Sequence, residues 1–88
     1  MVEKKVVVAN RAGIHARPAS IIVEKTKNFK SSIHFEHGET CINAKSILGI
    51  ITLGAAYNTQ LTITADGEDE EAAIAALTHL FESKFEED

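Results

Sequence analysis

The hydrophobic pattern of this 88-residue chain switches repeatedly between the period of a strand and the period of a helix. Residues 2–9 are rich in β-branched side chains and alternate loosely, which predicts a strand. Residues 32–43 alternate, turn at Gly38 and alternate again, which predicts a hairpin. Residues 60–67 alternate with Leu61, Ile63 and Ala65 on the inward face. The chain therefore offers several short strands, separated by other structure.

Two further segments carry the spacing of amphipathic helices. In residues 16–29 the apolar face consists of Ala19, Ile22, Val23 and Thr26. In residues 68–85 it consists of Ala73, Leu77, Leu80 and Phe81. The second helix opens with acidic residues, which suit the positive end of a helix dipole.

Residues 45–55 (KSILGIITLGA) allow two interpretations. An apolar run bounded by glycines fits a buried strand. A helix that starts after Ser46 would spread apolar side chains over more than half of its circumference, so that some of them stay exposed and form a patch of the kind that binds partners. If the segment is a helix, the order is β-α-β-β-α-β-α, which packs helices on one face of a mostly antiparallel sheet.

Length and composition indicate a single domain over residues 1–88. The net charge of −4, with no basic run, argues against nucleic acid as a partner. The one cysteine, Cys41, cannot form an internal disulfide; we expect a half-buried strand residue and a reducing compartment. No stretch approaches the length of a membrane span, so we expect a cytoplasmic protein without membrane insertion.

The other histidines do not suggest a metal site. His34 and His37 are three residues apart on a strand and its turn, and His79 stands in the last predicted helix without a partner one turn away. We expect these side chains to be structural or exposed, and we expect neither a metal nor a cofactor. The acidic C-terminus is most simply a solvated tail.

The stretch NRAGIHARPAS, residues 10–20, concentrates unusual residues at a helix start. Pro18 suits a first turn, where its missing N–H breaks no hydrogen bond, so the helix begins within a residue or two of His15. Gly13 permits a tight turn before it. The N–H groups of Ala16 and Arg17 and the Arg17 guanidinium would then form an anion site beside the imidazole. A histidine there is a natural phosphoryl acceptor.

The residues alone leave a simpler interpretation open, in which His15 is an ordinary surface histidine at a loop end and Arg17 is solvated. Resemblance adds to the phosphoryl-acceptor hypothesis. AGIHARPAS resembles the active-centre signature of the HPr family, the phosphocarrier proteins of the bacterial phosphotransferase system. INAKSILGIITLG, residues 42–54, resembles the second signature of that family, and residues 61–77 are similar to its closing strand and helix.

The resemblance implies an α+β open-faced sandwich, in which three helices cover one face of a four-stranded antiparallel sheet of order 1-4-2-3. It implies that residues 47–53 are a short helix. It further implies that His15 is phosphorylated on Nδ1 by enzyme I, which is charged from phosphoenolpyruvate, and passes the phosphoryl group to IIA domains of sugar permeases. Arg17 would stabilise the phosphohistidine and Pro18 would set the helix start. Such a carrier is a substrate of other enzymes and not itself an enzyme.

Ser46 also has two interpretations. From the residues it is an N-cap, whose hydroxyl accepts an N–H of the first helical turn. The resemblance implies in addition a regulatory phosphorylation of Ser46 by an ATP-dependent serine kinase/phosphorylase.

The resemblance also implies a docking surface. It comprises the apolar Ile47, Leu48 and Ile51 and, on the first helix, Ser20, Glu24 and Lys27. Glu24 departs from relatives that carry lysine or a neutral residue at this place. The alternative to a carrier is a mainly regulatory HPr-like protein, whose phosphoserine form binds a catabolite-control transcription factor. In either case we expect a monomer.

Overall fold

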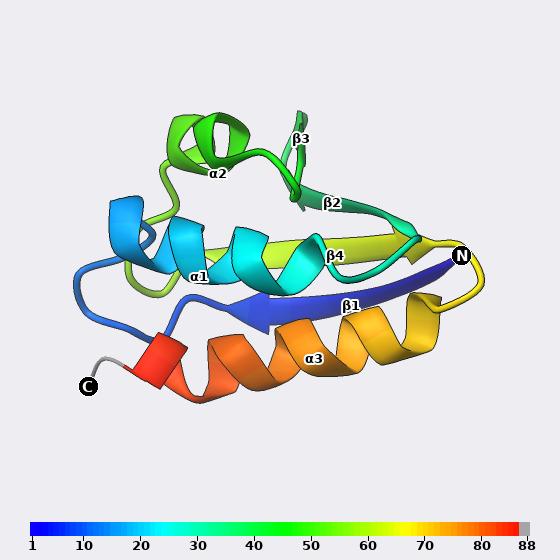
Figure 1. Cartoon of the computed structure of the whole chain (residues 1–88). Coiled ribbons are helices and arrows are strands. Elements are labelled where there is room, and N and C mark those ends of the chain that lie inside the picture. The colour runs from blue at the N-terminus through cyan, green and yellow to red at the C-terminus, as the bar shows by residue number, and fades with distance from the viewer. Residues whose placement is uncertain (87–88) are drawn as a thin grey trace.

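The order of helices and strands in the computed structural model, which describes residues 1–86, is the one that the resemblance implied (Figure 1). The elements are β1 (Val2–Val7), α1 (Ala16–Thr26), β2 (Ser32–His37), β3 (Thr40–Asn43), α2 (Ile47–Leu53), β4 (Gln60–Asp66) and α3 (Glu70–Glu82), followed by the short 3₁₀ turn η1 (Lys84–Glu86). The strands form one antiparallel sheet in the order β1-β4-β2-β3. The helices cover one face of it, so the expected open-faced α+β sandwich is confirmed.

The segment with two interpretations is a helix, and the strand interpretation is wrong. The Gly49 N–H donates to Ser46 Oγ at 3.1 Å, which caps the first turn of α2 as predicted for an N-cap serine. Gly54 ends the helix at φ +61°, a left-handed conformation that glycine adopts without strain. Because only Ile50 of α2 is buried, most of the apolar circumference of this helix faces away from the core.

The core lies between the sheet and the helices, and its residues follow the alternation in the sequence. From β4 it takes Leu61, Ile63 and Ala65, and from α3 it takes Ala73, Ile74, Leu77, Leu80 and Phe81. The Phe81 ring packs edge-to-face between Phe35 and Phe85, at centroid distances of 5.7 and 4.9 Å. On α1 the expected face is buried except for Val23, which lies at its margin and is only partly covered.

Cys41 is exposed, contrary to the half-buried position that we expected. It lies on β3, which is an edge strand, and it alternates with Ile42, the residue of β3 that packs against the core. Cys41 therefore points to the open face of the sheet, where no helix covers it.

Asp69 joins two connections that are distant in sequence. Its carboxylate accepts hydrogen bonds from the backbone N–H groups of Lys30 and Ser31, at 2.8 and 3.0 Å, and from the Ser31 hydroxyl. These bonds, the Ser31 hydroxyl above all, lower the pKa of Asp69 from 3.8 to about 2. The start of α3 is thereby tied to the connection between α1 and β2.

We expect this tie to make stability depend on pH in acid. Since folding lowers the pKa of Asp69, its contribution is fully present above about pH 4 and is lost as the pH falls toward about 2. Asp69→Asn should therefore lower the free energy of unfolding at neutral pH and flatten its fall between these pH values. Urea denaturation at several pH values measures both effects. Glu71→Gln, at an exposed position on the same helix turn, should leave the pH profile unchanged, and an equal change in both variants would contradict the assignment.

Candidate functional site: the start of helix α1

His15 is the N-cap residue of α1, as the position of Pro18 predicted. Its backbone is extended, at φ −115° and ψ −163°, and its carbonyl oxygen accepts the first helical hydrogen bond from the Ala19 N–H at 3.0 Å. Pro18 is buried in the first turn, where it needs no donor, while His15 is exposed. The imidazole therefore stands at the surface, at the positive end of an eleven-residue helix.

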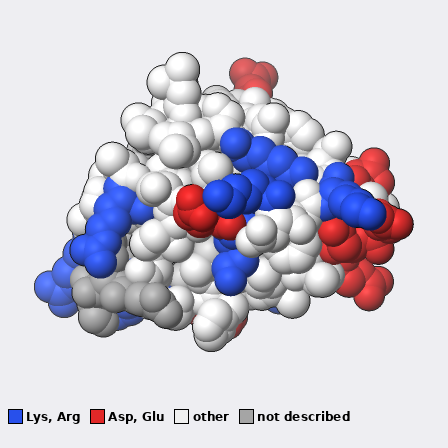
Figure 2. Space-filling model, viewed as in Figure 1, with Lys and Arg blue, Asp and Glu red and all other residues white. Residues whose placement is uncertain are grey.

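The surroundings of His15 suit an anion. The N–H groups of Ala16 and Arg17 precede the first intrahelical bond and so have no acceptor within the helix. The Arg17 side chain is exposed, and the first turn of α1 contains no acidic residue. Basic side chains lie at the end of the molecule where α1 begins and over the middle of this face, while most acidic ones lie at the opposite end, beside a further basic side chain (Figure 2). This arrangement can hold a phosphoryl group next to the ring.

The loop before His15 is closed by a buried amide. The Asn10 side chain is fully buried, and its Nδ2 donates to the Gly13 carbonyl oxygen at 2.7 Å. In the same turn the Gly13 N–H donates to the Asn10 carbonyl oxygen at 3.1 Å. Asn10 and Gly13 are thus joined by two hydrogen bonds, one from the Asn10 side chain and one between backbone groups.

The connection between α2 and β4, residues 54–59, is hydrogen-bonded to this loop from outside. We call these contacts between the two segments the brace. The Ile14 N–H donates to the Ala55 carbonyl oxygen at 2.8 Å. Gly13 lies at φ +75°, and a Cβ on it would meet the same Ala55 oxygen at 2.9 Å. Gly13 is therefore needed both for its conformation and for the close approach of the two segments.

A second pair of backbone bonds extends the brace. The Asn58 N–H donates to the Val8 carbonyl oxygen at 2.8 Å, and the Val8 N–H donates to the Thr59 carbonyl oxygen at 2.9 Å. Asn58 adopts φ +72°, a left-handed conformation that asparagine tolerates better than most residues other than glycine. The chain that leads to His15 is thus hydrogen-bonded on both sides of its turn.

The predicted docking residues lie on two neighbouring helices, α1 and α2. On α2, Ile47, Leu48 and Ile51 are 43%, 74% and 41% exposed and form an apolar patch. Helix α1 lies between α2 and α3 (Figure 1). The exposed face of α1 carries Ser20 and Glu24, and the exposed Lys27 follows at its C-terminal end.

Two of these α1 residues also lie along the side of the helix that faces α3. Ser20 and Glu24 line a groove between α1 and α3, together with His79 of α3 and Ser83, the residue that follows α3. The Glu24 carboxylate pairs with Lys27 Nζ at 3.0 Å. The departure at Glu24 therefore places an ion pair, and not an isolated negative charge, on the exposed face of α1.

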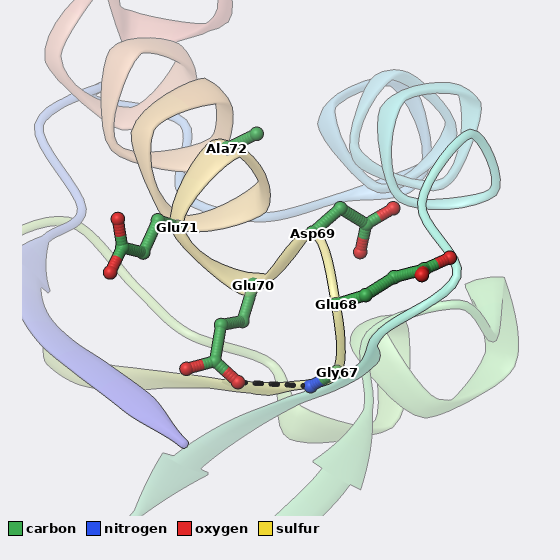
Figure 3. A pocket seen from close by; sticks show the side chains of 6 residues that line it. All are labelled: Gly67, Glu68, Asp69, Glu70, Glu71 and Ala72. Carbon is green, nitrogen blue, oxygen red and sulfur yellow. Dashed lines mark hydrogen bonds between the residues drawn. The ribbon is translucent and has the colours of Figure 1, made fainter.

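A hollow at the turn from β4 to α3 is acidic but does not form a second site. Figure 3 shows Glu68 and Asp69 extending to one side and Glu70 and Glu71 to the other, with Glu70 Oε1 accepting a hydrogen bond from the Gly67 N–H at 3.0 Å. Asp69 binds the connection before β2, and Glu68 pairs with Lys30. Within residues 1–86, no group of three or more His, Cys, Asp and Glu side chains could hold a metal ion, and no helix is long and apolar enough to cross a membrane.

Comparison with known proteins identifies the family. A family model described as "PTS HPr component phosphorylation site" matches residues 2–83. The phosphocarrier protein HPr of Treponema pallidum is 44% identical over the full length of both chains. The chain belongs to the HPr family of phosphocarrier proteins. Its general function is accordingly that of a phosphocarrier of the phosphotransferase system and not of an enzyme as such.

Solved structures of relatives agree with the fold. The crystal structure of HPr from Thermoanaerobacter tengcongensis is 43% identical and superposes with a TM-score of 0.96, covering 100% of this chain and 99% of that one. Crh, a catabolite repression protein of Bacillus subtilis, is 36% identical with a TM-score of 0.77, covering 96% of this chain and 97% of its own, and was crystallised as a swapped dimer. An HPr dimer from Thermoanaerobacter tengcongensis is 44% identical, with a TM-score of 0.77 and coverage of 97% and 98%. Since some homologues dimerise, the expected monomer stays a prediction.

Sequence reasoning missed Asn10 and Ala55, although both lie at the candidate site. The sequence analysis assigned no role to Asn10, and nothing in the sequence shows that its side chain is buried. Ala55 acts through its backbone oxygen, which no side-chain pattern can reveal. Only the unusual Gly13 pointed toward a close contact.

We expect the brace to be a main determinant of local stability. Gly13→Ala places a Cβ against the Ala55 oxygen at a positive φ, whereas Gly38→Ala meets only the conformational cost, because no atom lies within 4 Å of its Cβ position. Gly38→Ala should cost about 1 kcal/mol, and Gly13→Ala roughly 1 to 3 kcal/mol more. Urea denaturation of both variants measures the difference; equal costs would show that the loops move apart freely.

Proposed function

We propose that His15 is the residue that carries the phosphoryl group between enzyme I and the IIA domains of sugar permeases. The observation that supports this most directly is the exposed imidazole at the N-cap of α1, beside the N–H groups of Ala16 and Arg17. Of the four histidines, His15 alone stands at the start of a helix. We place this reaction in the cytoplasm, where enzyme I has access to the carrier.

Each transfer is a displacement at phosphorus. The Nδ1 lone pair of His15 attacks the phosphorus atom carried by phosphorylated enzyme I. The new phosphorus–nitrogen bond forms as the bond to the donor breaks, and the electron pair of the broken bond stays with enzyme I. A nucleophile of the IIA domain then attacks the same phosphorus and leaves His15 in its original state.

Arg17 and the start of α1 stabilise the charged group in this scheme. The phosphoryl oxygens would accept hydrogen bonds from the Ala16 and Arg17 N–H groups, and the guanidinium can bind two oxygens at once. Pro18 sets the first turn of α1. Its own missing N–H costs no hydrogen bond there, and the N–H groups of the residues before it remain available at the helix end.

The direct test is labelling from phosphoenolpyruvate by purified enzyme I. The parent protein should acquire an acid-labile label, and His15→Ala should acquire none. His37→Ala is the matched control, because it removes an exposed histidine from β2 and should be labelled normally. Label on His15→Ala would assign the phosphoryl group to another residue and overturn the proposal.

Ser46 is the second residue of the proposal, as the target of a serine kinase/phosphorylase. Transfer of the terminal phosphoryl group of ATP to Ser46 Oγ would release ADP and the hydroxyl proton. The added charge would lie at the start of α2, next to Ile47 and Leu48, which are exposed. Partners that approach this patch with acidic surfaces would be repelled.

We therefore expect Ser46→Asp to slow charging by enzyme I, because the carboxylate mimics part of that charge. Ser46→Ala is the control. It removes the hydrogen bond from the Gly49 N–H to the Ser46 hydroxyl, which should cost about 1 kcal/mol of stability. Because it adds no negative charge, enzyme I should phosphorylate this variant at the parental rate. Initial rates at several salt concentrations measure the effect, and an equal rate for all three proteins would exclude Ser46 as a control point.

A mainly regulatory function is the alternative, favoured by the 36% identity to Crh, a catabolite repression protein. In that case the phosphoserine form would bind a catabolite-control transcription factor, and transfer from His15 to IIA domains would fail. Transfer from the labelled protein to a IIA domain distinguishes the two functions, since only a carrier passes the label on.

A further inference from the structure

We propose that Asn10 is a positioning residue for His15, and that its buried side chain holds the imidazole in the geometry needed for phosphoryl transfer. This inference rests on the proposed function of His15. It assigns to Asn10 no contact with the phosphoryl group. Asn10 would act through the turn of residues 10–13 and through the brace that this turn forms with Ala55.

The burial of Asn10 is the first argument. Asparagine is mostly found at protein surfaces, and the burial of an amide is costly unless it is hydrogen-bonded. The Asn10 side chain is nevertheless 0% exposed, and its Nδ2 bonds the Gly13 carbonyl oxygen at 2.7 Å. A solvated polar loop would need no such residue, so the buried amide serves the shape of the loop.

The path from Asn10 to His15 is short and continuous. The amide holds the Gly13 carbonyl, which belongs to the same peptide group as the Ile14 N–H. That N–H donates to the Ala55 oxygen at 2.8 Å, and Ile14 is followed directly by His15. One plane, the Gly13–Ile14 peptide, is therefore bonded at both ends, and this fixes the direction in which the chain enters α1.

Position matters strongly for this reaction. A shift of about 1 Å in a reacting group can cost a factor of about 100 in rate. Without the amide, the Gly13 carbonyl could turn to water and the Ile14 N–H could lose its alignment with Ala55. The predicted docking residues of α2 and α1 do not include Asn10, whose side chain is buried, so we expect binding to enzyme I to be unaffected.

The experiment compares Asn10→Ala with Thr26→Val. Thr26 is also fully buried, and its hydroxyl donates to the Ala44 carbonyl oxygen at 2.9 Å, but it lies at the opposite end of α1 from His15. Both variants remove a buried hydrogen bond from a side chain to a backbone carbonyl oxygen. Single-turnover transfer from phosphorylated enzyme I, measured against carrier concentration, separates the maximal rate from the half-saturating concentration.

We expect Asn10→Ala to lower the maximal rate roughly ten- to a hundred-fold without a change in half-saturation. Thr26→Val should lose stability in urea denaturation but keep the parental rate. An unchanged rate for Asn10→Ala, or an equal loss in both variants, would overturn the proposal.

Hydrogen exchange of the unmodified parent protein adds a test that needs neither a variant nor the reaction. The Ile14 amide should be protected as well as the amides inside α1. Rapid exchange, typical of a loose loop, would overturn the proposal even if every variant failed to fold. If the parent protein itself is not labelled at His15, the proposed function fails, and the exchange result still decides whether Asn10 holds the turn.

Discussion

The hydrogen bond from the Ile14 N–H to the Ala55 oxygen joins the two parts of this molecule on which its function depends. One part is the loop that ends at His15, and the other is the connection that leaves α2. A single backbone bond contributes only about 1 kcal/mol. Its importance comes from its place, since Gly13 allows the two segments to approach closely and Asn10 holds the turn from within.

This contact explains how a small domain can keep a reactive side chain exposed and still well positioned. In the proposed function the imidazole has to stay exposed, because both enzyme I and a IIA domain would have to reach it. The order therefore resides in its supports, which are the buried Pro18 on one side and the bonded turn of residues 10–13 on the other. The apolar patch on α2 is supported in the same way, since Ile50 anchors the helix in the core while Ile47, Leu48 and Ile51 stay exposed.

The prediction from sequence succeeded where the signal is local. The helix start at His15 followed from Pro18, and the cap of α2 followed from Ser46, because both depend on the conformation of a few adjacent residues. The inward faces of β4 and α3 followed from periodicity. The segment of residues 45–55 could not be assigned by its own pattern, since a short apolar run fits both a strand and a helix; resemblance to the family was needed.

The sequence by itself determined the strands, the first and last helices, their core faces and the residue types gathered at His15, because propensity, periodicity and turn chemistry act over a few neighbouring residues. Only the tertiary structure decided that Asn10 is buried, that Ala55 bonds the loop through its backbone oxygen and that Cys41 faces the open side of the sheet. Burial and backbone approach depend on which distant segments meet. Such meetings are a property of the packed chain, and no local pattern encodes them.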